Sequence, residues 1–305
     1  MQVIVHGGAG GVPDDPEPRQ AVLDEAAAAG TDAATPLDAV EAAVRVLESS
    51  PRFNAGVGAC AQSDGILRTD AGVMTDDRSA GAACGMPGVE AAVSVARGVL
   101  EETPHVLLSG VHAVDFAADL GLDTERDLWT DSTRERFAEA DVPEGDLGAQ
   151  AAWVRETFGG ATADPDAEEE DAGADGEAPA GKDHDTVGAV ATDSESFAAA
   201  TSTGGRWLAL AGRVGDVPQI GSGFYCSPAG GASATGAGED IARVTLSRRA
   251  VRYLEDGLPA PAAAERAIGE FGELTGSSAG IIVHDGERAG LAFNSEGMQT
   301  ARAER

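Results

Sequence analysis

The sequence predicts a mixed α/β fold in which β-sheets lie between layers of helices. Stretches with helical periodicity alternate with short strand-like runs, and helical stretches stand before and after the paired strand runs. With 305 residues and 42% hydrophobic content, the chain can bury one large core or two smaller ones. Only 4% of the residues are aromatic, so Ala, Val and Leu must fill that core.

The first part of the chain, residues 1–160, combines strands and helices. Short apolar runs near glycines predict strands over 2–6, 56–61, 66–71 and 79–84. Apolar residues at helical spacing predict helices over 18–30, 36–48, 89–101, 110–119 and 146–157.

The last part, residues 186–305, is richer in strands. The same rules predict strands over 186–192, 197–203, 231–236, 279–284, 289–293 and 298–302, with helices over 238–256 and 260–271. We expect both parts to form one structural domain together.

Residues 161–185 separate the two parts. This acidic segment contains almost no large apolar residue, so burial cannot offset the entropy of ordering it. Taken alone, it is predicted to be a disordered spacer. It ends directly before Thr186, however, and this position favours a role in processing of the chain.

The charge balance is strongly acidic. The chain has 52 Asp and Glu against 21 Lys and Arg, a net charge of −31, and Lys182 is its only lysine. Nucleic acids and anionic membranes are therefore not expected as partners. Self-repulsion of this size is tolerable where salt shortens the Debye length to about 3 Å at 1 M. We interpret the sequence as that of a halophilic protein, since a merely acidic mesophilic enzyme would not explain the lack of lysine.

Cysteine usage and the N-terminus indicate a cytoplasmic protein. Cys60, Cys84 and Cys226 are odd in number and lack CxxC spacing, which argues against a disulfide framework or a zinc site. They are predicted to be small buried hydrophobic residues. Met1 leads directly into a short strand-like run, without a basic region or a long apolar stretch, so neither a signal peptide nor a membrane span is expected.

Thr186 is the strongest candidate for a catalytic group. A threonine hydroxyl is a poor nucleophile unless a base lies close to it. Its own α-amine, with a pKa of roughly 8, can be that base once the preceding peptide bond is cut. The acidic segment ending at Asp185 is what a cleavable linker before a catalytic N-terminal threonine would look like, although a threonine opening a strand is ordinarily structural.

A set of short motifs extends this interpretation to the whole chain. In order they are HGGAG (6–10), FNAGVGA (53–59), DAGVM (70–74), HDTVGAV (184–190), TSTGG (201–205), GRVGD (212–216), ATGAGE (234–239) and FNSEGM (293–298). Together they resemble the plant-type L-asparaginase and isoaspartyl peptidase family of N-terminal nucleophile hydrolases.

The resemblance implies a four-layer αββα sandwich and autocatalytic cleavage between Asp185 and Thr186. Cleavage would give one fragment that contains the α-subunit portion, residues 1–160, followed by the linker 161–185, and a β-subunit of residues 186–305, assembled as a homodimer of cleaved protomers. The implied reaction is hydrolysis of the β-amide of L-asparagine or of isoaspartyl peptides to release L-aspartate, with no organic cofactor. Most family members have Gly before the nucleophile, and Asp185 instead resembles the glycosylasparaginase branch, which leaves that activity as an alternative. A non-catalytic acidic protein of the same fold is the second alternative.

The resemblance also implies roles for residues around the nucleophile. Thr203 would orient Thr186, and Asn54 would add a hydrogen bond nearby. Thr235 and Gly236 would form the oxyanion hole, and Gly238 would lie in the wall near Arg213 and Asp216. From the residues alone, ATGAG is a glycine-rich helix N-cap, whose free N–H groups and small side chains suit an anionic ligand equally well.

Arg213 and Asp216 lie three residues apart in a glycine-punctuated loop. An α-amino acid presents a carboxylate and an ammonium group, so a guanidinium and a carboxylate held together can bind both. The resemblance implies this substrate-clamping role. The alternative is a surface ion pair, worth under about 1 kcal/mol.

The segment LESSPRFNAGV (47–57) matches a family loop whose backbone carbonyls hold a monovalent cation, Na⁺ or K⁺. The implied ligands are the carbonyls of Leu47, Glu48, Ser50, Phe53, Ala55 and Val57, and carbonyl oxygens suit hard cations. His6 and His184 lack the partners and spacing of a metal site or a catalytic triad. His6 is predicted to be a strand-end residue with its hydrogen bonds satisfied.

Overall fold

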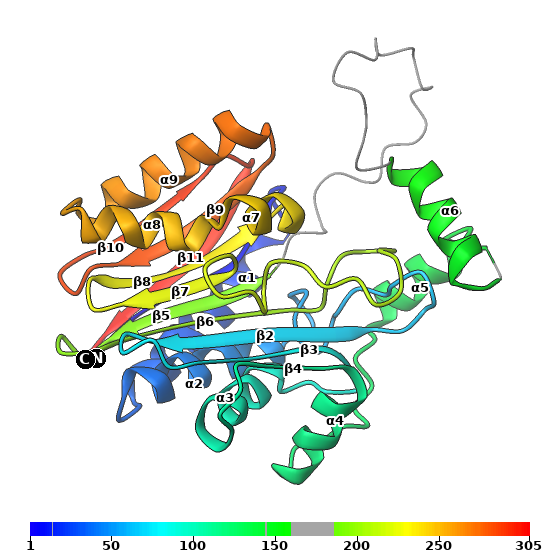
Figure 1. The fold of residues 1–305 in the computed structure, drawn as a ribbon, viewed down its shortest axis with the longest axis horizontal. Coiled ribbons are helices and arrows are strands. Elements are labelled where there is room, and N and C mark those ends of the chain that lie inside the picture. The colour runs from blue at the N-terminus through cyan, green and yellow to red at the C-terminus, as the bar shows by residue number, and fades with distance from the viewer. Residues whose placement is uncertain (14, 144, 160–185) are drawn as a thin grey trace.

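The computed structural model describes residues 1–13, 15–143, 145–159 and 186–305. Two β-sheets lie face to face, and helices cover the outer face of each (Figure 1). The predicted mixed α/β class, with sheets between helical layers, is confirmed. The acidic segment 161–185, including Asp185, His184 and Lys182, lies outside the described residues.

The larger sheet joins strands from both parts of the chain. Its strands are β1 (Gln2–Gly10), β2 (Arg68–Thr75), β3 (Ala80–Pro87), β4 (Leu107–Ser109), β5 (Val187–Thr192), β6 (Phe197–Thr203) and β11 (Gly297–Glu304). Their spatial order is β11-β1-β5-β6-β2-β3-β4. Strand β1 is antiparallel to both β11 and β5, so the N-terminal strand lies between two strands from the last part of the chain.

The smaller sheet is built from the last part of the chain alone. Its order is β10-β9-β8-β7, from strands β7 (Phe224–Ser227), β8 (Gly230–Gly236), β9 (Ala279–His284) and β10 (Ala289–Phe293). Alternate side chains of β8 face opposite sides. Ala232 and Ala234 pack against the helices, whereas the Ser233 hydroxyl reaches Thr201 of the larger sheet at 2.6 Å. This alternation directs Thr235 toward the larger sheet as well.

Helices form the two outer layers. Helices α1 (Pro16–Thr31), α2 (Pro36–Glu48), α3 (Ala92–Glu102) and α4 (Gly110–Asp119) pack on the larger sheet, and α7 (Gly238–Val244), α8 (Leu246–Glu255) and α9 (Ala260–Thr275) cover the smaller one. Helices α5 (Asp131–Glu139) and α6 (Leu147–Phe158) bury no residue completely and lie to one side (Figure 1).

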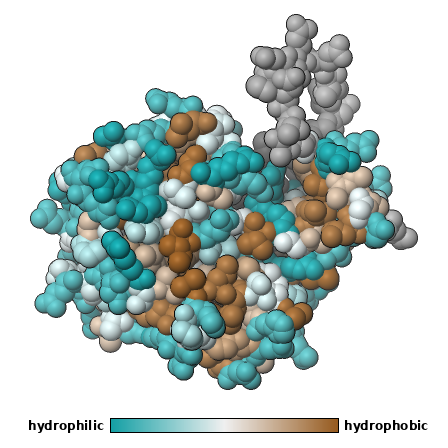
Figure 2. All heavy atoms as spheres, viewed as in Figure 1, coloured by the Kyte–Doolittle hydropathy of each residue, from teal (hydrophilic) through white to brown (hydrophobic). Residues whose placement is uncertain are grey.

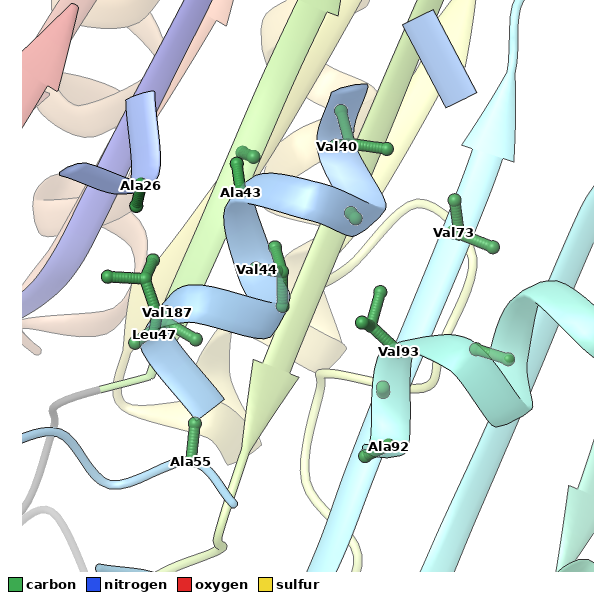
Figure 3. Close-up of a cluster of buried hydrophobic side chains, with 14 of the residues drawn as sticks. Ala26, Val40, Ala43, Val44, Leu47, Ala55, Val73, Ala92, Val93 and Val187 are labelled. Carbon is green, nitrogen blue, oxygen red and sulfur yellow. The ribbon is translucent and has the colours of Figure 1, made fainter. Parts of the chain in front are cut away.

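Small side chains fill the core, as the composition predicts. Figure 3 shows Val40 and Val44 of α2 lying over the larger sheet near Val73 and Val187, and all four side chains are fully buried. Such side chains allow helices to approach closely. A β-carbon at Gly81 of β3 would lie only 2.1 Å from the backbone oxygen of Ala96 in α3.

Several element predictions were wrong. Residues 56–61 form a loop because Gly56 and Gly58 adopt positive φ angles of 55° and 99°, which a regular strand does not contain. The predicted helix 238–256 is two helices, since Thr245 adopts a left-handed φ of 53° between them. Strands β4 and β7 and helix α5 were missed. Strands of three and four residues are too short for a periodic pattern.

The surface is mostly hydrophilic over α8 and α9, while hydrophobic side chains gather in the centre and lower part of the face drawn in Figure 2. Val106, Leu107 and Val111, beside edge strand β4, are large apolar residues that remain exposed. Within the described part of the chain, no helix has the length and apolar character needed to cross a membrane.

Candidate active site

A cavity of about 250 Å³ lies where β5, β6 and β8 meet the start of α7. This volume is below the roughly 300–1,000 Å³ of pockets for drug-sized ligands, so the cavity suits a small molecule. The predicted site residues that line it are Thr186, Thr203, Arg213, Asp216, Gly236 and Gly238. The other lining residues are Gly205, Arg206, Gly215, Ala237, Glu239, Asp240 and Ser277.

Thr186 and Thr203 meet at the floor of the cavity. Thr186 directly precedes β5, and the register of β5 on β6 continues to place it beside Thr203. The Thr186 hydroxyl donates to Oγ1 of Thr203 at 3.1 Å, and this oxygen also accepts the Gly205 N–H at 3.2 Å. Both threonines are buried, so the position of the Thr186 hydroxyl is well defined.

The end of β8 forms the adjacent wall. Gly236 has a φ of 136°, and a β-carbon there would lie 2.5 Å from the backbone oxygen of Ser278. Only glycine fits this position. Thr235 is completely buried just behind the cavity wall, on the strand face that looks toward the larger sheet.

Asn54 lies behind the turn that follows Thr203 rather than in the cavity. Its Nδ2 donates to the Gly205 carbonyl at 2.6 Å, its Oδ1 accepts the Cys60 N–H at 3.0 Å, and its backbone oxygen accepts the Gly204 N–H at 2.8 Å. Asn54 therefore determines the course of the TSTGG turn, which in turn supports Thr203.

Arg213 and Asp216 converge on one side of the cavity but do not form the surface ion pair considered as an alternative. Arg213 Nε donates to Oε1 of Glu239 at 2.8 Å. Asp216 is buried, and its Oδ2 has no hydrogen-bond partner among the described residues. A β-carbon at Gly238 would lie 2.7 Å from Asp216 Oδ1 and 2.8 Å from Arg213 Nη2, so the absent side chain leaves the space between these groups open.

Burial controls the charge state of this side of the cavity. It raises the pKa of Asp216 to about 7, although the charge of Arg213 acts in the opposite direction. Asp70, opposite Thr203 in the register of β2 on β6, is also buried. Burial raises its pKa to about 7 against a hydrogen bond from the Gly85 N–H and the charges of Arg213 and Arg68. Both carboxyl groups are thus poised to change charge near neutral pH.

Sequence reasoning missed residues that lie close to Arg213. Gln62 is buried; its Oε1 accepts the Gly212 N–H at 2.7 Å and its Nε2 donates to the Arg213 carbonyl at 2.9 Å. Gln62 is 150 residues from Gly212, so no local pattern could reveal this contact. Glu239, the last residue of the motif ATGAGE, and Arg206, directly after TSTGG, were also missed, because their pairing joins distant segments.

Two of the carbonyl groups predicted to hold a cation in the loop 47–57 accept backbone hydrogen bonds. The Glu48 carbonyl accepts the Val57 N–H at 2.8 Å and the Leu47 carbonyl accepts the Ser50 N–H at 3.2 Å. A β-carbon at Gly58 would lie 2.6 Å from the Phe53 oxygen, so glycine keeps open the space that this oxygen faces. A monovalent cation held by this loop therefore stays a prediction.

His6 and the cysteines have structural surroundings. His6 lies inside β1, which extends to Gly10, so its placement at a strand end was wrong. Its Nε2 is 2.8 Å from Ser233 Oγ, but its buried Nδ1 has no hydrogen-bond partner among the described residues, so the expectation of satisfied hydrogen bonds was also wrong. Burial lowers its pKa to about 3. The three cysteines are buried and none of them is in a disulfide, as predicted.

The sequence of this chain matches the family model described as Asparaginase over residues 1–305. The chain belongs to the asparaginase family. It is 38% identical to a plant-type L-asparaginase of Pyrococcus furiosus, over 99% of this chain and 95% of the relative. It is 39% identical to an isoaspartyl peptidase of Salmonella typhimurium, over 87% of this chain and 80% of the relative.

A third relative carries both activities in its name. The isoaspartyl peptidase/L-asparaginase of Rattus norvegicus is 35% identical over 88% of this chain and 75% of its own length. The family assignment expected from the motifs is therefore confirmed. The asparaginase family match covers the segments that supply the whole cavity lining, from Thr186 to Ser277.

Proposed function

We propose that this chain is an N-terminal threonine amidohydrolase that releases L-aspartate from L-asparagine, from isoaspartyl peptides, or from both. The observation that carries the proposal is the common cavity of Thr186, Arg213 and Asp216. A buried nucleophile there lies beside a guanidinium and a carboxylate, which are complementary to the carboxylate and ammonium of an amino acid. The names of the relatives from Pyrococcus furiosus and Salmonella typhimurium support the two substrate classes.

In the proposed reaction the Thr186 hydroxyl attacks the β-carbonyl of the substrate, and the free α-amine of Thr186 takes its proton. The N–H of Gly236 and the hydroxyl of Thr235 stabilise the oxyanion. The tetrahedral intermediate then expels ammonia or an amine, which leaves with the proton, and a β-aspartyl ester remains on Thr186. Water hydrolyses this ester and L-aspartate is released.

The clamp explains selection for an aspartyl group. Arg213 keeps its Nη atoms for the α-carboxylate, because its Nε is held by Glu239. The α-ammonium would donate to Asp216 Oδ2, the buried oxygen without a partner among the described residues. Nearby positive charge favours the ionised form of Asp216, so substrate binding and ionisation of Asp216 reinforce each other.

The α-amine of Thr186 becomes free only if the chain is cut before it, and we propose autocatalytic cleavage between Asp185 and Thr186. The α-subunit would contain residues 1–160 and the β-subunit residues 186–305, folded together as the αββα sandwich of N-terminal nucleophile hydrolases. The two face-to-face sheets with outer helices support this fold. The position of Thr186 at the start of β5 supports the cleavage site.

Three further features complete the proposal. A Na⁺ or K⁺ ion would be held by the carbonyls of loop 47–57. A melting temperature that is higher in NaCl than in choline chloride at equal ionic strength would support this site. The cleaved protomers would form a homodimer, for which the exposed apolar residues beside β4 offer a surface. The protein would be cytoplasmic and halophilic, as the acidic composition suggests.

One experiment tests the central proposal. Purified protein is analysed by intact mass and assayed on L-asparagine, a β-aspartyl dipeptide and glycosylated asparagine. We expect a β-subunit beginning at Thr186 and release of L-aspartate from one of the first two substrates. Thr186→Ala should remain a single inactive chain, and Thr186→Ser should cleave and keep reduced activity, because it keeps the hydroxyl but loses the methyl group that restricts its rotamer.

The remaining outcomes separate the alternatives. Release of aspartate only from glycosylated asparagine would favour a glycosylasparaginase-like enzyme. An uncleaved wild-type chain without any of these activities would favour a non-catalytic protein of the same fold. Full activity in an unbroken chain would overturn the mechanism.

A further inference from the structure

The cavity contains a second arginine that the proposed chemistry does not use. The exposed fractions of the lining residues indicate how deep each one lies in the cavity. Thr186 is 9% and Asp216 6% exposed, and the side chain of Arg213 is 17% exposed. The side chains of Arg206 and Glu239 are 47% and 44% exposed. Arg206 therefore lies at the mouth of the cavity, beyond the aspartyl clamp.

Glu239 connects the two arginines. Its Oε1 accepts Arg213 Nε at 2.8 Å, and its Oε2 lies 3.8 Å from Arg206 Nη1. Burial opposes ionisation of Glu239, but the hydrogen bond and charge of Arg213 outweigh this effect and its pKa lies below the usual value. At neutral pH Glu239 is thus a carboxylate that holds Arg213 firmly and Arg206 loosely.

The guanidinium of Arg206 has donors to spare. A guanidinium carries five N–H groups. Among the described residues, Arg206 has only the 3.8 Å ion pair with Glu239 and a ring contact with Phe158 at 5.9 Å. The other acidic group at the mouth, Asp240, is already occupied by Arg243 at 2.7 Å and by the Ser277 hydroxyl at 2.5 Å.

The charges of the cavity match one substrate class better than the other. L-Asparagine has one carboxylate and one ammonium, which Arg213 and Asp216 can bind. A β-aspartyl dipeptide has a second carboxylate, at the end of the leaving amino acid. With the aspartyl end held by the clamp and its β-carbonyl at Thr186, the leaving group has to extend toward the remaining, more exposed lining, where Arg206 lies.

We propose that Arg206 binds the carboxylate of the leaving amino acid, so that the preferred substrates are β-aspartyl dipeptides with a free C-terminus. This inference rests on the proposed hydrolase function. Planar guanidinium groups bind carboxylates with two parallel hydrogen bonds. In a longer peptide the carboxylate lies further from the scissile bond, so the advantage should be confined to dipeptides.

The test compares wild type with Arg206→Ala on L-asparagine, β-aspartyl-leucine and β-aspartyl-leucine amide, all at the same salt concentration. We expect Arg206→Ala to raise KM for β-aspartyl-leucine about tenfold, since the partly exposed guanidinium retains much of its hydration. Its kcat should change little, and its kinetics on L-asparagine should equal those of wild type. Wild type should prefer the acid over the amide by a similar factor, and the variant should lose this preference.

The controls separate failure of the inference from failure of the proposed function. Arg252→Ala removes an equal charge from an exposed position on α8 and should leave the kinetics on all three substrates unchanged. Chain cleavage and melting temperature identify any folding defect of the variants. If wild type hydrolyses none of the substrates, the proposed function itself fails. If it hydrolyses them and Arg206→Ala leaves KM for β-aspartyl-leucine unchanged, or affects L-asparagine equally, the role of Arg206 is overturned while the hydrolase function stands.

Discussion

The hydroxyl oxygens of Thr186 and Thr203 lie 3.1 Å apart on neighbouring strands, and Asp70 stands opposite Thr203 on the next strand. Thr186 and Thr203 line the cavity, and Asp70 is the register partner of Thr203 on β2. If Thr186 is the nucleophile, its hydrogen bond to Thr203 would determine the orientation of its hydroxyl.

Replacement of Thr203 by valine removes this hydroxyl while keeping the shape of the side chain. We expect kcat to fall about 10- to 100-fold, because one buried hydrogen bond to the nucleophile is lost. The measurement is steady-state kinetics on protein shown by mass to be cleaved. Ser202→Ala is the control, since Ser202 faces Glu48 rather than the cavity and should affect stability more than kcat.

Arg213→Ala should weaken transition-state binding by about 2–4 kcal/mol and lower kcat/KM accordingly. Cleavage of the chain should proceed, since it requires no bound substrate. Arg213→Lys should restore little activity, because lysine lacks the planar guanidinium group that can donate two parallel hydrogen bonds to a carboxylate. Intact mass and kinetics on the same samples check both statements. Near-normal kcat/KM in Arg213→Ala would make the residue structural.

The pKa of about 7 at Asp216 predicts a pH dependence for amino acid binding. The ionised carboxylate binds the substrate ammonium, and the ammonium in turn lowers the pKa of Asp216, so binding should tighten as pH rises through 7. Arg213, Glu239 and Asp70 also act on this carboxyl group. The inhibition constant of L-aspartate, measured from pH 5.5 to 8.5, tests the prediction. Asp216→Asn should bind weakly at every pH, and an unchanged inhibition constant in wild type would contradict the assignment.

The burial of the Glu48 carboxyl group leads us to predict that the stability of the protein depends on pH. Its carboxyl group is completely buried, accepts the Ser202 hydroxyl at 2.6 Å and the Val93 N–H at 2.9 Å, and burial raises its pKa to about 8. Because the folded-state pKa is raised, its contribution to stability is fully present below about pH 4 and is lost as pH rises through 8.

Glu48→Gln removes this titration. The difference in melting temperature between variant and wild type should therefore shift in favour of the variant between pH 6 and pH 9. A difference that stays constant over this range would show that Glu48 does not titrate there in the folded protein.

The net charge of −31 predicts a requirement for salt. Repulsion among surface carboxylates should lower the melting temperature in dilute buffer, and molar KCl should raise it by screening. A melting series from 0.1 to 3 M KCl measures the effect. A maximum near 0.1 M would remove the halophilic interpretation and leave the catalytic proposal intact.

The predicted site residues found in one cavity are those that belong to local motifs. Thr186 follows an acidic segment, and the residues GRVGD and ATGAG combine glycines with polar side chains. Local composition is enough to recognise such motifs. Gln62, Asp70 and Arg206, which lie in or near the site, were not recognisable, because they depend on partners contributed by other segments.

The sequence alone predicted the mixed α/β class, the alanine- and valine-rich core and most helices. Periodicity and composition are properties of neighbouring residues, so they can be read without the tertiary structure. Only the tertiary structure decided that β1 lies between β5 and β11, that Thr245 divides a helix, and that Glu239 bridges two arginines. These features depend on strand pairing, backbone strain and burial between distant segments. Such interactions arise only after the chain has folded, so no window of neighbouring residues contains them.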